Sequence, residues 1–130
     1  MKAEIIAIGS ELLLGQLVDT NSSYIARRLA EQGIELIQTS TVGDDLSRIE
    51  LVLREAIQRS SVVITTGGLG PTEDDLTREG VAKVFRRPLV FQPRLMEQIE
   101  AMFKRRGFRM AENNRKQAYI PEGAVPIENP

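Results

Sequence analysis

A glycine-rich turn followed by acidic residues holds the densest set of chemically capable groups in this sequence. Residues 62–78 are VVITTGGLGPTEDDLTR, in which Gly67, Gly68 and Gly70 follow a β-branched run. Glycine lacks a Cβ and tolerates a positive φ, so a ligand can approach its backbone closely. Backbone N–H groups in such a turn, between a strand and a helix, are suited to binding an anion such as phosphate.

Three acids, Glu73, Asp74 and Asp75, come directly after this turn. Bare carboxylates would repel phosphate, but a divalent cation that bridges carboxylate and phosphate oxygens would remove the conflict. The alternative is an ordinary strand-to-helix turn whose acids face the positive end of the helix dipole. The stretch alone leaves both interpretations open. Asp75 is the strongest metal candidate of the three because of its distance from the glycines, and Asp74 is expected to point outward.

Two further turns combine glycine with acid. Gly9 is followed by Ser10 and Glu11, and Gly43 is followed by Asp44 and Asp45. Each turn comes after a run of residues expected to form a strand. The carboxyl ends of parallel strands lie at one edge of a sheet, where ligands bind in open α/β folds. We therefore expect residues 9–11, 43–45 and 67–75 to converge, which favours a functional interpretation.

The elements that would position these turns alternate between strand and helix. Strands are expected over 4–8, 34–42 and 62–66, the last as the central strand, buried on both faces because of its β-branched residues. Shorter extended pieces are expected at 89–91 and 118–120, and residues 10–15 are expected to form a loop. The alternation predicts an α/β fold, a parallel sheet with helices on both faces.

Four helices are expected between these strands. Thr20 and Asn21 are good N-cap residues for a helix ending at Gln32. Ser47 and Glu50 would form a capping box for the next helix. Thr77 would cap a third helix that ends before Pro88, and Pro93 suits the first turn of a fourth that ends at Gly107.

The composition restricts the chemistry. The 130 residues, enough for one domain with a real core, include no cysteine and no histidine. Disulfides, thiolate or imidazole metal ligands and serine–histidine triads are therefore excluded from this chain. The net charge of −1 gives no field that favours nucleic acid. No apolar run approaches the roughly 20 residues of a membrane span, so we expect a cytoplasmic protein.

Four motifs together resemble a known family. GGLGPTEDDLT resembles the glycine-rich signature of the molybdopterin-binding (MoCF) domain, and IGSELLLGQLVDTNSSYIARRLAEQG, TVGDDLSRI and KQAYIPEGA extend the match from Ile6 to Pro130. Together they closely resemble the N-terminal domain of the competence/damage-inducible CinA family. The resemblance implies a three-layer α/β/α sandwich with a mostly parallel sheet. Leu69 stands where the cofactor-synthesis enzymes usually carry threonine, which weakens the transfer of molybdopterin binding specifically.

The resemblance also implies an activity and a site. Domains of the CinA type are associated with divalent-metal-dependent ADP-ribose pyrophosphatase activity, and the family's two functional aspartates match Asp44 and Asp75. Glu11 would join them as a ligand of Mg²⁺, Mn²⁺ or Co²⁺. The alternative is a module that binds molybdopterin or a nucleotide without turnover. The expected contacts to substrate and phosphate come from Asn21, Thr66, Gly67, Gly68, Gly70, Thr72 and Lys116.

Two expectations concern the extent of the protein. The resemblance implies that residues 1–130 are a single domain cut short at its C-terminal end, because the family's first domain continues past Pro130. Many relatives carry a second domain with nicotinamide mononucleotide deamidase activity, and that activity is not assigned to this chain. The resemblance also implies a homo-oligomer that binds a small molecule, with no nucleic-acid or membrane partner.

Overall fold

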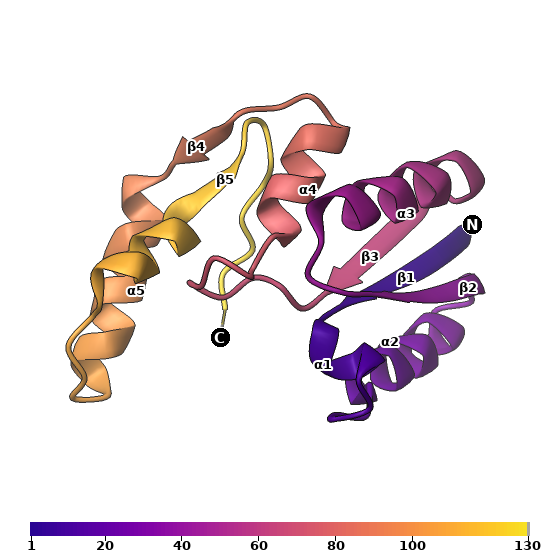
Figure 1. The fold of residues 1–130 in the computed structure, drawn as a ribbon, viewed down its shortest axis with the longest axis horizontal. Coiled ribbons are helices and arrows are strands. Elements are labelled where there is room, and N and C mark those ends of the chain that lie inside the picture. The colour runs from indigo at the N-terminus through magenta and orange to yellow at the C-terminus, as the bar shows by residue number, and fades with distance from the viewer. Residues whose placement is uncertain (130) are drawn as a thin grey trace.

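A computed structural model of the chain describes residues 1–129, arranged as two groups of elements (Figure 1). A three-layer core contains the first three strands, and a smaller unit contains a two-stranded antiparallel sheet with its helices. In chain order the elements are β1 (Lys2–Ile8), α1 (Ser10–Leu13), α2 (Thr20–Glu31), β2 (Glu35–Val42), α3 (Leu46–Arg59), β3 (Val62–Thr66), α4 (Thr77–Val84), β4 (Leu89–Phe91), α5 (Pro93–Arg105), η1 (Glu112–Ala118) and β5 (Tyr119–Pro121).

The core sheet is parallel, with the strand order β2-β1-β3. β1 is the central strand, and its residues from Ala3 to Ile8 are buried. The expectation that residues 62–66 form the central strand, buried on both faces, was wrong. β3 pairs only with β1 within the described residues, and its side chains are half-buried. Its β-branched composition reflects contact with helices on its faces, and composition alone does not report how many strands lie beside it.

Side chains on the two faces of β1 enter different apolar clusters. Ile6 and Ile8 pack with Ile49 of α3, and Ala3 and Ile5 pack with Leu29 of α2. α2 therefore covers one face and α3 the other, as Figure 1 shows. Successive side chains of a strand point to opposite faces, so this alternation builds both interfaces from one segment. The expected three-layer α/β sandwich with a parallel sheet is confirmed.

In the smaller unit, η1 lies beside two short strands. These strands, β4 and β5, pair antiparallel as a separate two-stranded sheet. The rings of Phe91 in β4 and Tyr119 in β5 lie with their centroids 5.4 Å apart. The guanidinium of Arg115, in η1, lies 4.4 Å from the centre of the Phe91 ring, a cation–π contact that attaches η1 to β4. No helix within residues 1–129 combines the length and apolar character needed to cross a membrane.

The helix starts differ from the expected caps. The side chain of Asp19 accepts a hydrogen bond from the Ser22 N–H at 3.0 Å and caps α2, so Thr20 and Asn21 lie inside the helix. Asp45 caps α3 by accepting from the Arg48 N–H at 3.2 Å, in place of the expected capping box. Both caps are aspartates one residue or more earlier than expected, and a carboxylate serves at least as well as a hydroxyl there. Residues 10–13, expected in a loop, form the short helix α1.

A buried ion pair joins the opposite end of the sheet to α3. Glu4, on β1, is 1% exposed. Its carboxylate accepts hydrogen bonds from the Arg59 guanidinium at 2.8 and 3.3 Å and from the Ser60 hydroxyl at 2.6 Å. The hydrogen bond from Arg59 holds the pKa of Glu4 below its usual value, against the opposing effect of burial. Glu4 is therefore ionised at neutral pH and satisfied.

Replacing Arg59 with methionine is expected to lower the free energy of unfolding at pH 7, because the buried Glu4 carboxylate loses its charged donor. The folded-state pKa of Glu4 lies below the unfolded one, so its contribution is present above the unfolded pKa and is lost as pH falls through the folded pKa. Urea unfolding over a series of pH values, from 7 down through the range in which Glu4 becomes protonated, checks this. A cost of the substitution that does not change over the whole series would contradict the role assigned to the ion pair.

Candidate functional site

The first two acidic turns meet at the carboxyl edge of the sheet. The Gly9 N–H donates to the Val42 carbonyl at 2.9 Å. Ser10 and Asp44 then exchange two hydrogen bonds, because the Ser10 N–H donates to the Asp44 carboxylate at 3.3 Å and the Asp44 N–H donates to the Ser10 hydroxyl at 3.0 Å. The expected convergence of residues 9–11 and 43–45 is confirmed, and Ser10 is the residue that joins them.

The glycine turn lies against the same edge. Gly67 has φ 90°, and a Cβ there would lie 2.1 Å from the Ile8 carbonyl oxygen at the end of β1. Only glycine therefore allows β3 to turn this close to the central strand. Asn21, near the start of α2, donates to the Thr66 hydroxyl at 3.2 Å. Two of the predicted ligand-binding residues thus lie together beside the turn.

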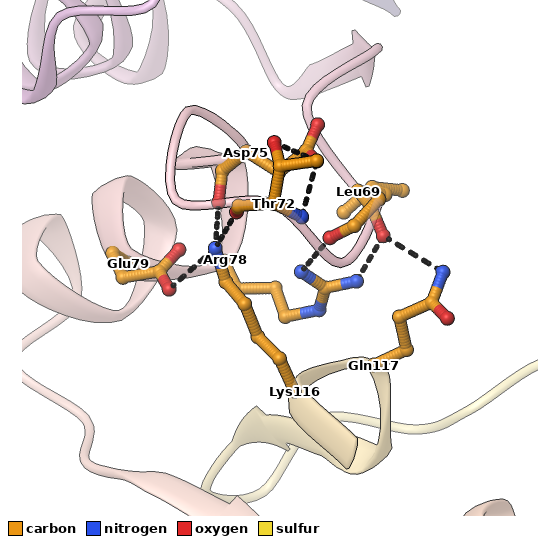
Figure 2. A network of polar contacts seen from close by, with 8 residues as sticks. Leu69, Thr72, Asp75, Arg78, Glu79, Lys116 and Gln117 are labelled. Carbon is orange, nitrogen blue, oxygen red and sulfur yellow. Dashed lines mark hydrogen bonds and ion pairs between the residues drawn. The ribbon is translucent and has the colours of Figure 1, made fainter. Parts of the chain in front are cut away.

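The carbonyl groups of the turn are held from α4. The Thr77 hydroxyl donates to the Gly67 carbonyl at 2.7 Å, so Thr77 anchors the turn rather than capping its helix. The Arg78 guanidinium donates to the carbonyls of Leu69 and Gly70, as Figure 2 shows for this network. Arg78 is only 8% exposed. Its cation therefore stabilises the backbone of the loop.

Residues of η1 hold the other side of the loop (Figure 2). The Lys116 ammonium donates to the Thr72 carbonyl at 2.7 Å and to the Asp75 carbonyl, and it lies 3.4 Å from a carboxylate oxygen of Glu79. An ammonium has three N–H donors, so these partners match its full capacity. Lys116 therefore holds the loop here, and its predicted contact with phosphate stays a prediction.

The carboxylate of Asp75 folds back onto its own loop. One oxygen accepts from the Thr72 N–H at 2.9 Å and from the Thr72 hydroxyl at 2.7 Å. Burial alone would raise the pKa of Asp75, but these bonds, the backbone of Gly70 and the charge of Lys116 lower it below its usual value. Asp75 is thus ionised, and its carboxylate already accepts hydrogen bonds from both donors of Thr72. Thr72 was predicted from the sequence to bind phosphate instead.

Backbone donors of the loop remain open. Within the hydrogen bonds of residues 1–129, the N–H groups of Gly68 and Leu69 donate to no acceptor. The carbonyls of Gly67 and Leu69 are fixed toward α4 and η1. In a trans peptide the N–H points opposite to the carbonyl of the preceding residue. The Gly68 N–H is therefore held away from α4, where an anion can accept it.

The predicted metal ligands do not form a ready-made cluster. In the part of the chain that the structure describes, no group of three acids is placed to hold a metal ion. The Asp44 carboxylate is bonded to the Ser10 N–H, and that of Asp75 to Thr72. Mg²⁺ is commonly bound by one or two carboxylates together with substrate phosphates. These residues could therefore hold a metal ion only together with a phosphate ligand. The assignment of Glu11, Asp44 and Asp75 as metal ligands stays a prediction.

Comparisons with known proteins agree with this architecture. A family model described as a probable molybdopterin-binding domain matches residues 4–127. A putative competence-damage inducible protein of Halothermothrix orenii is 52% identical over 130 residues, which cover 100% of this chain and 32% of that protein. The chain thus spans about a third of the length of the curated relatives it matches.

Solved structures give the same result. The CinA protein of Thermoplasma acidophilum superposes with a TM-score of 0.91 at 35% identity, over 100% of this chain and 76% of that one. The tungsten cofactor synthesizing protein MoaB of Pyrococcus furiosus superposes with a TM-score of 0.61 at 26% identity, over 81% of this chain and 63% of its own. From the family match and the CinA structure together, the chain belongs to the family of molybdopterin-binding-like domains, and within it to the CinA proteins.

Proposed function

We propose that this domain binds the phosphate of a nucleotide or pterin ligand at the glycine turn. The observation that carries the proposal is the pair of open donors, the N–H groups of Gly68 and Leu69, on a loop whose carbonyls are held by Arg78 and Lys116. A loop fixed in this way has already lost the conformational entropy that ligand binding would otherwise cost. Asn21 and Thr66 lie beside the turn and supply uncharged hydrogen-bonding groups.

We further propose that the ligand is a nucleoside-diphosphate sugar such as ADP-ribose, and that the domain hydrolyses its pyrophosphate. Asp44 and Asp75, with Glu11, would hold Mg²⁺, Mn²⁺ or Co²⁺ together with phosphate oxygens. When bound, the ion would screen the pyrophosphate charge and lower the pKa of a water molecule. The N–H groups of Gly68 and Leu69 would stabilise negative charge on a phosphate oxygen. Support for this activity comes from the resemblance to CinA domains.

ADP-ribose is expected to release AMP in the presence of Mn²⁺, and an Asp44→Asn, Asp75→Asn double variant is expected to lose this activity. Chromatography of the nucleotides measures the product. A Glu73→Gln, Asp74→Asn double variant is the matched control, because it removes the same two charges from exposed neighbouring positions. Full activity in the first variant would refute the hydrolytic proposal and leave phosphate binding untouched.

The alternative function is a binding module that holds molybdopterin or a nucleotide without turnover. The bonding of the Asp75 carboxylate to Thr72 favours it, because an acid used inside its own loop has less freedom to bind a metal. Titration calorimetry separates the two. Tight binding of molybdopterin with no hydrolysis of ADP-ribose would support the module.

Self-association and a cytoplasmic location also remain proposals. The loop after α1 carries exposed apolar side chains, and this surface is available for a second copy of the chain. A Leu14→Asp, Val18→Asp variant is expected to shift a homo-oligomer to monomer, as measured by analytical ultracentrifugation. Leu51→Asp, on an exposed position of α3, is the control. Unchanged sedimentation of the double variant would exclude this surface. The exposed apolar residues of this surface, in the loop and in the helices on either side of it, are Leu13, Leu14, Leu17, Val18 and Tyr24.

A further inference from the structure

The charges of this chain are unevenly distributed, although its net charge is only −1. Residues 83–116 contain ten lysines and arginines against three glutamates, whereas residues 1–82 contain seven lysines and arginines against thirteen aspartates and glutamates. The first of these segments includes β4, α5 and most of η1. The smaller unit is therefore strongly cationic and the core acidic, an asymmetry that the net charge does not reveal.

The densest part of this positive charge lies at the end of α5. Residues 104–109 are KRRGFR and form the basic tip. All four of its cationic side chains are exposed. Within residues 1–129 none of them makes an ion pair, although Glu100 and Glu112 lie nearby in the sequence. The four cations are Lys104, Arg105, Arg106 and Arg109.

An exposed aromatic ring lies among these cations. The N–H of Gly107 donates to the Lys104 carbonyl at 3.2 Å, and the N–H of Phe108 donates to the Phe103 carbonyl at 3.0 Å. With φ 72° at Gly107, these two bonds form a Schellman motif, which ends α5 and fixes the backbone of Phe108. An apolar residue at this place usually packs against its own helix, yet Phe108 is 67% exposed. The ring is thus held in solvent at a defined position.

The basic tip projects from the molecule. Figure 1 shows the end of α5 at the outer end of the smaller unit, on the side away from the core sheet. Small ligands bind in concave sites, so a projecting tip does not suit them. A broad surface can touch such a tip without meeting the remainder of the domain. The shape therefore indicates an extended partner.

The chemistry of the tip matches an anionic membrane surface. Acidic lipid headgroups attract Lys and Arg side chains near the bilayer. Aromatic rings are favoured at headgroup level, where they bury apolar area beside polar groups. Cations at the end of a helix also offset its dipole, but Arg109 lies beyond α5 and Phe108 carries no charge. The dipole alone therefore does not account for the composition of the tip.

The other aromatic rings of the smaller unit make single-stranded nucleic acid a poorer match. Proteins that bind single strands stack successive bases on several aromatic side chains along a positive groove. Phe91 and Tyr119 pack against each other, and Phe103 is half-buried. Within the described residues of the smaller unit, Phe108 is thus the one ring available to a base.

We infer that the basic tip binds an anionic lipid surface, with its four cations at the headgroups and the Phe108 ring inserted between them. Such peripheral binding needs no membrane-spanning helix, so it is compatible with the helices of residues 1–129. It replaces the expectation that the domain has no membrane partner. It does not depend on phosphate binding at the glycine turn.

A single fluorescent reporter tests the insertion of the ring. The chain contains no tryptophan, so a Phe108→Trp variant has one indole. Its emission is expected to move to shorter wavelength when vesicles of equal parts phosphatidylglycerol and phosphatidylcholine are added. Vesicles of phosphatidylcholine alone should leave the emission unchanged, and salt should weaken the response because it screens the attraction. Phe85→Trp is the matched control, since Phe85 is 53% exposed outside the tip, and its emission should not move.

Co-sedimentation with the same vesicles tests the cations. A Lys104→Glu, Arg109→Glu variant is expected to bind about tenfold more weakly or worse. An Arg48→Glu, Arg54→Glu variant makes the same change in net charge at exposed positions of α3, and it should bind within about twofold of the unsubstituted chain. Phe108→Ser keeps all four cations and is expected to bind about fivefold more weakly, because the apolar contact is lost.

Three results would overturn the inference. The first is failure of the unsubstituted chain to co-sediment with phosphatidylglycerol vesicles, which requires no variant to fold. The second is equal weakening in the tip variant and the α3 variant, since net charge alone would then explain binding. The third is binding of oligothymidylate in place of vesicles, with quenching of the Phe108→Trp emission by stacked bases. None of these results bears on the glycine turn, so the proposed function would stand or fall separately.

Discussion

Replacing Gly67 with alanine is expected to lower the free energy of unfolding by about 3 kcal/mol or more, the largest stability loss of any single substitution considered for this site. Gly67 has φ 90°, and its added Cβ would lie 2.1 Å from the carbonyl oxygen of Ile8. That oxygen belongs to the last residue of β1, which pairs with Val42 of β2. The substitution therefore combines backbone strain with a clash at the carboxyl edge of the sheet.

Gly33→Ala is the matched control for this prediction. Gly33 also has a positive φ, 70°, but a Cβ there would meet nothing within 4 Å. It is expected to cost only about 1 kcal/mol, the strain of the left-handed conformation itself. Urea unfolding of both variants measures the difference. Equal costs would show that the close approach of the turn to β1 contributes nothing to stability.

Replacing Asp75 with asparagine is expected to reduce ADP-ribose hydrolysis by about 100-fold or more, if the carboxylate acts with the metal. Asparagine can still accept hydrogen bonds from Thr72, so the loop keeps much of its form and the lost charge accounts for the change. Binding of inorganic phosphate without metal is expected to stay the same or to increase, because a negative charge has left the site. Steady-state kinetics and phosphate titration measure the two effects separately.

The neighbouring Asp74→Asn variant controls for the loss of a charge, since Asp74 is exposed beside Asp75. The Asp74→Asn variant should retain activity.

A second readout for Asp75 is the pH dependence of stability. The folded pKa of Asp75 is lowered, so its stabilising contribution exists above the unfolded pKa and is lost as pH falls through the folded pKa. Unchanged hydrolysis in Asp75→Asn, with only this stability effect remaining, would make Asp75 a structural residue of the loop.

The part of this fold that the sequence predicted rests on local patterns. Apolar periodicity and glycine positions were enough to place the strands and to bring three turns to one edge, as the Ser10–Asp44 contacts and the close approach of Gly67 to Ile8 confirm. The order of the strands could not be predicted from local patterns, because it depends on which distant segments pair. β3 has the composition of a central strand, but within residues 1–129 it lies at the edge of the sheet and β1 occupies the centre.

The side chains that hold the glycine loop were the hardest to predict. Lys116 was predicted to contact phosphate, yet Lys116 and Arg78 both donate to loop carbonyls. Lys116 is 44 residues from Thr72 in sequence, and no local pattern reports a contact over that separation. Asp75 is only three residues from Thr72 in the sequence. A turn closed by a hydrogen bond to its own aspartate is a local pattern, so this contact could have been predicted, but Thr72 was assigned to phosphate instead.

The central claim is that the glycine turn binds the phosphate of a nucleotide or pterin ligand beside Asp44 and Asp75. A crystal structure of the chain with ADP-ribose and Mn²⁺ tests it most directly. The expected result is a phosphate oxygen within hydrogen-bonding distance of the Gly68 and Leu69 N–H groups, with the ion between that phosphate and the two aspartates. A ligand bound elsewhere, with the turn unchanged and Asp75 still bonded only to Thr72, would contradict the claim.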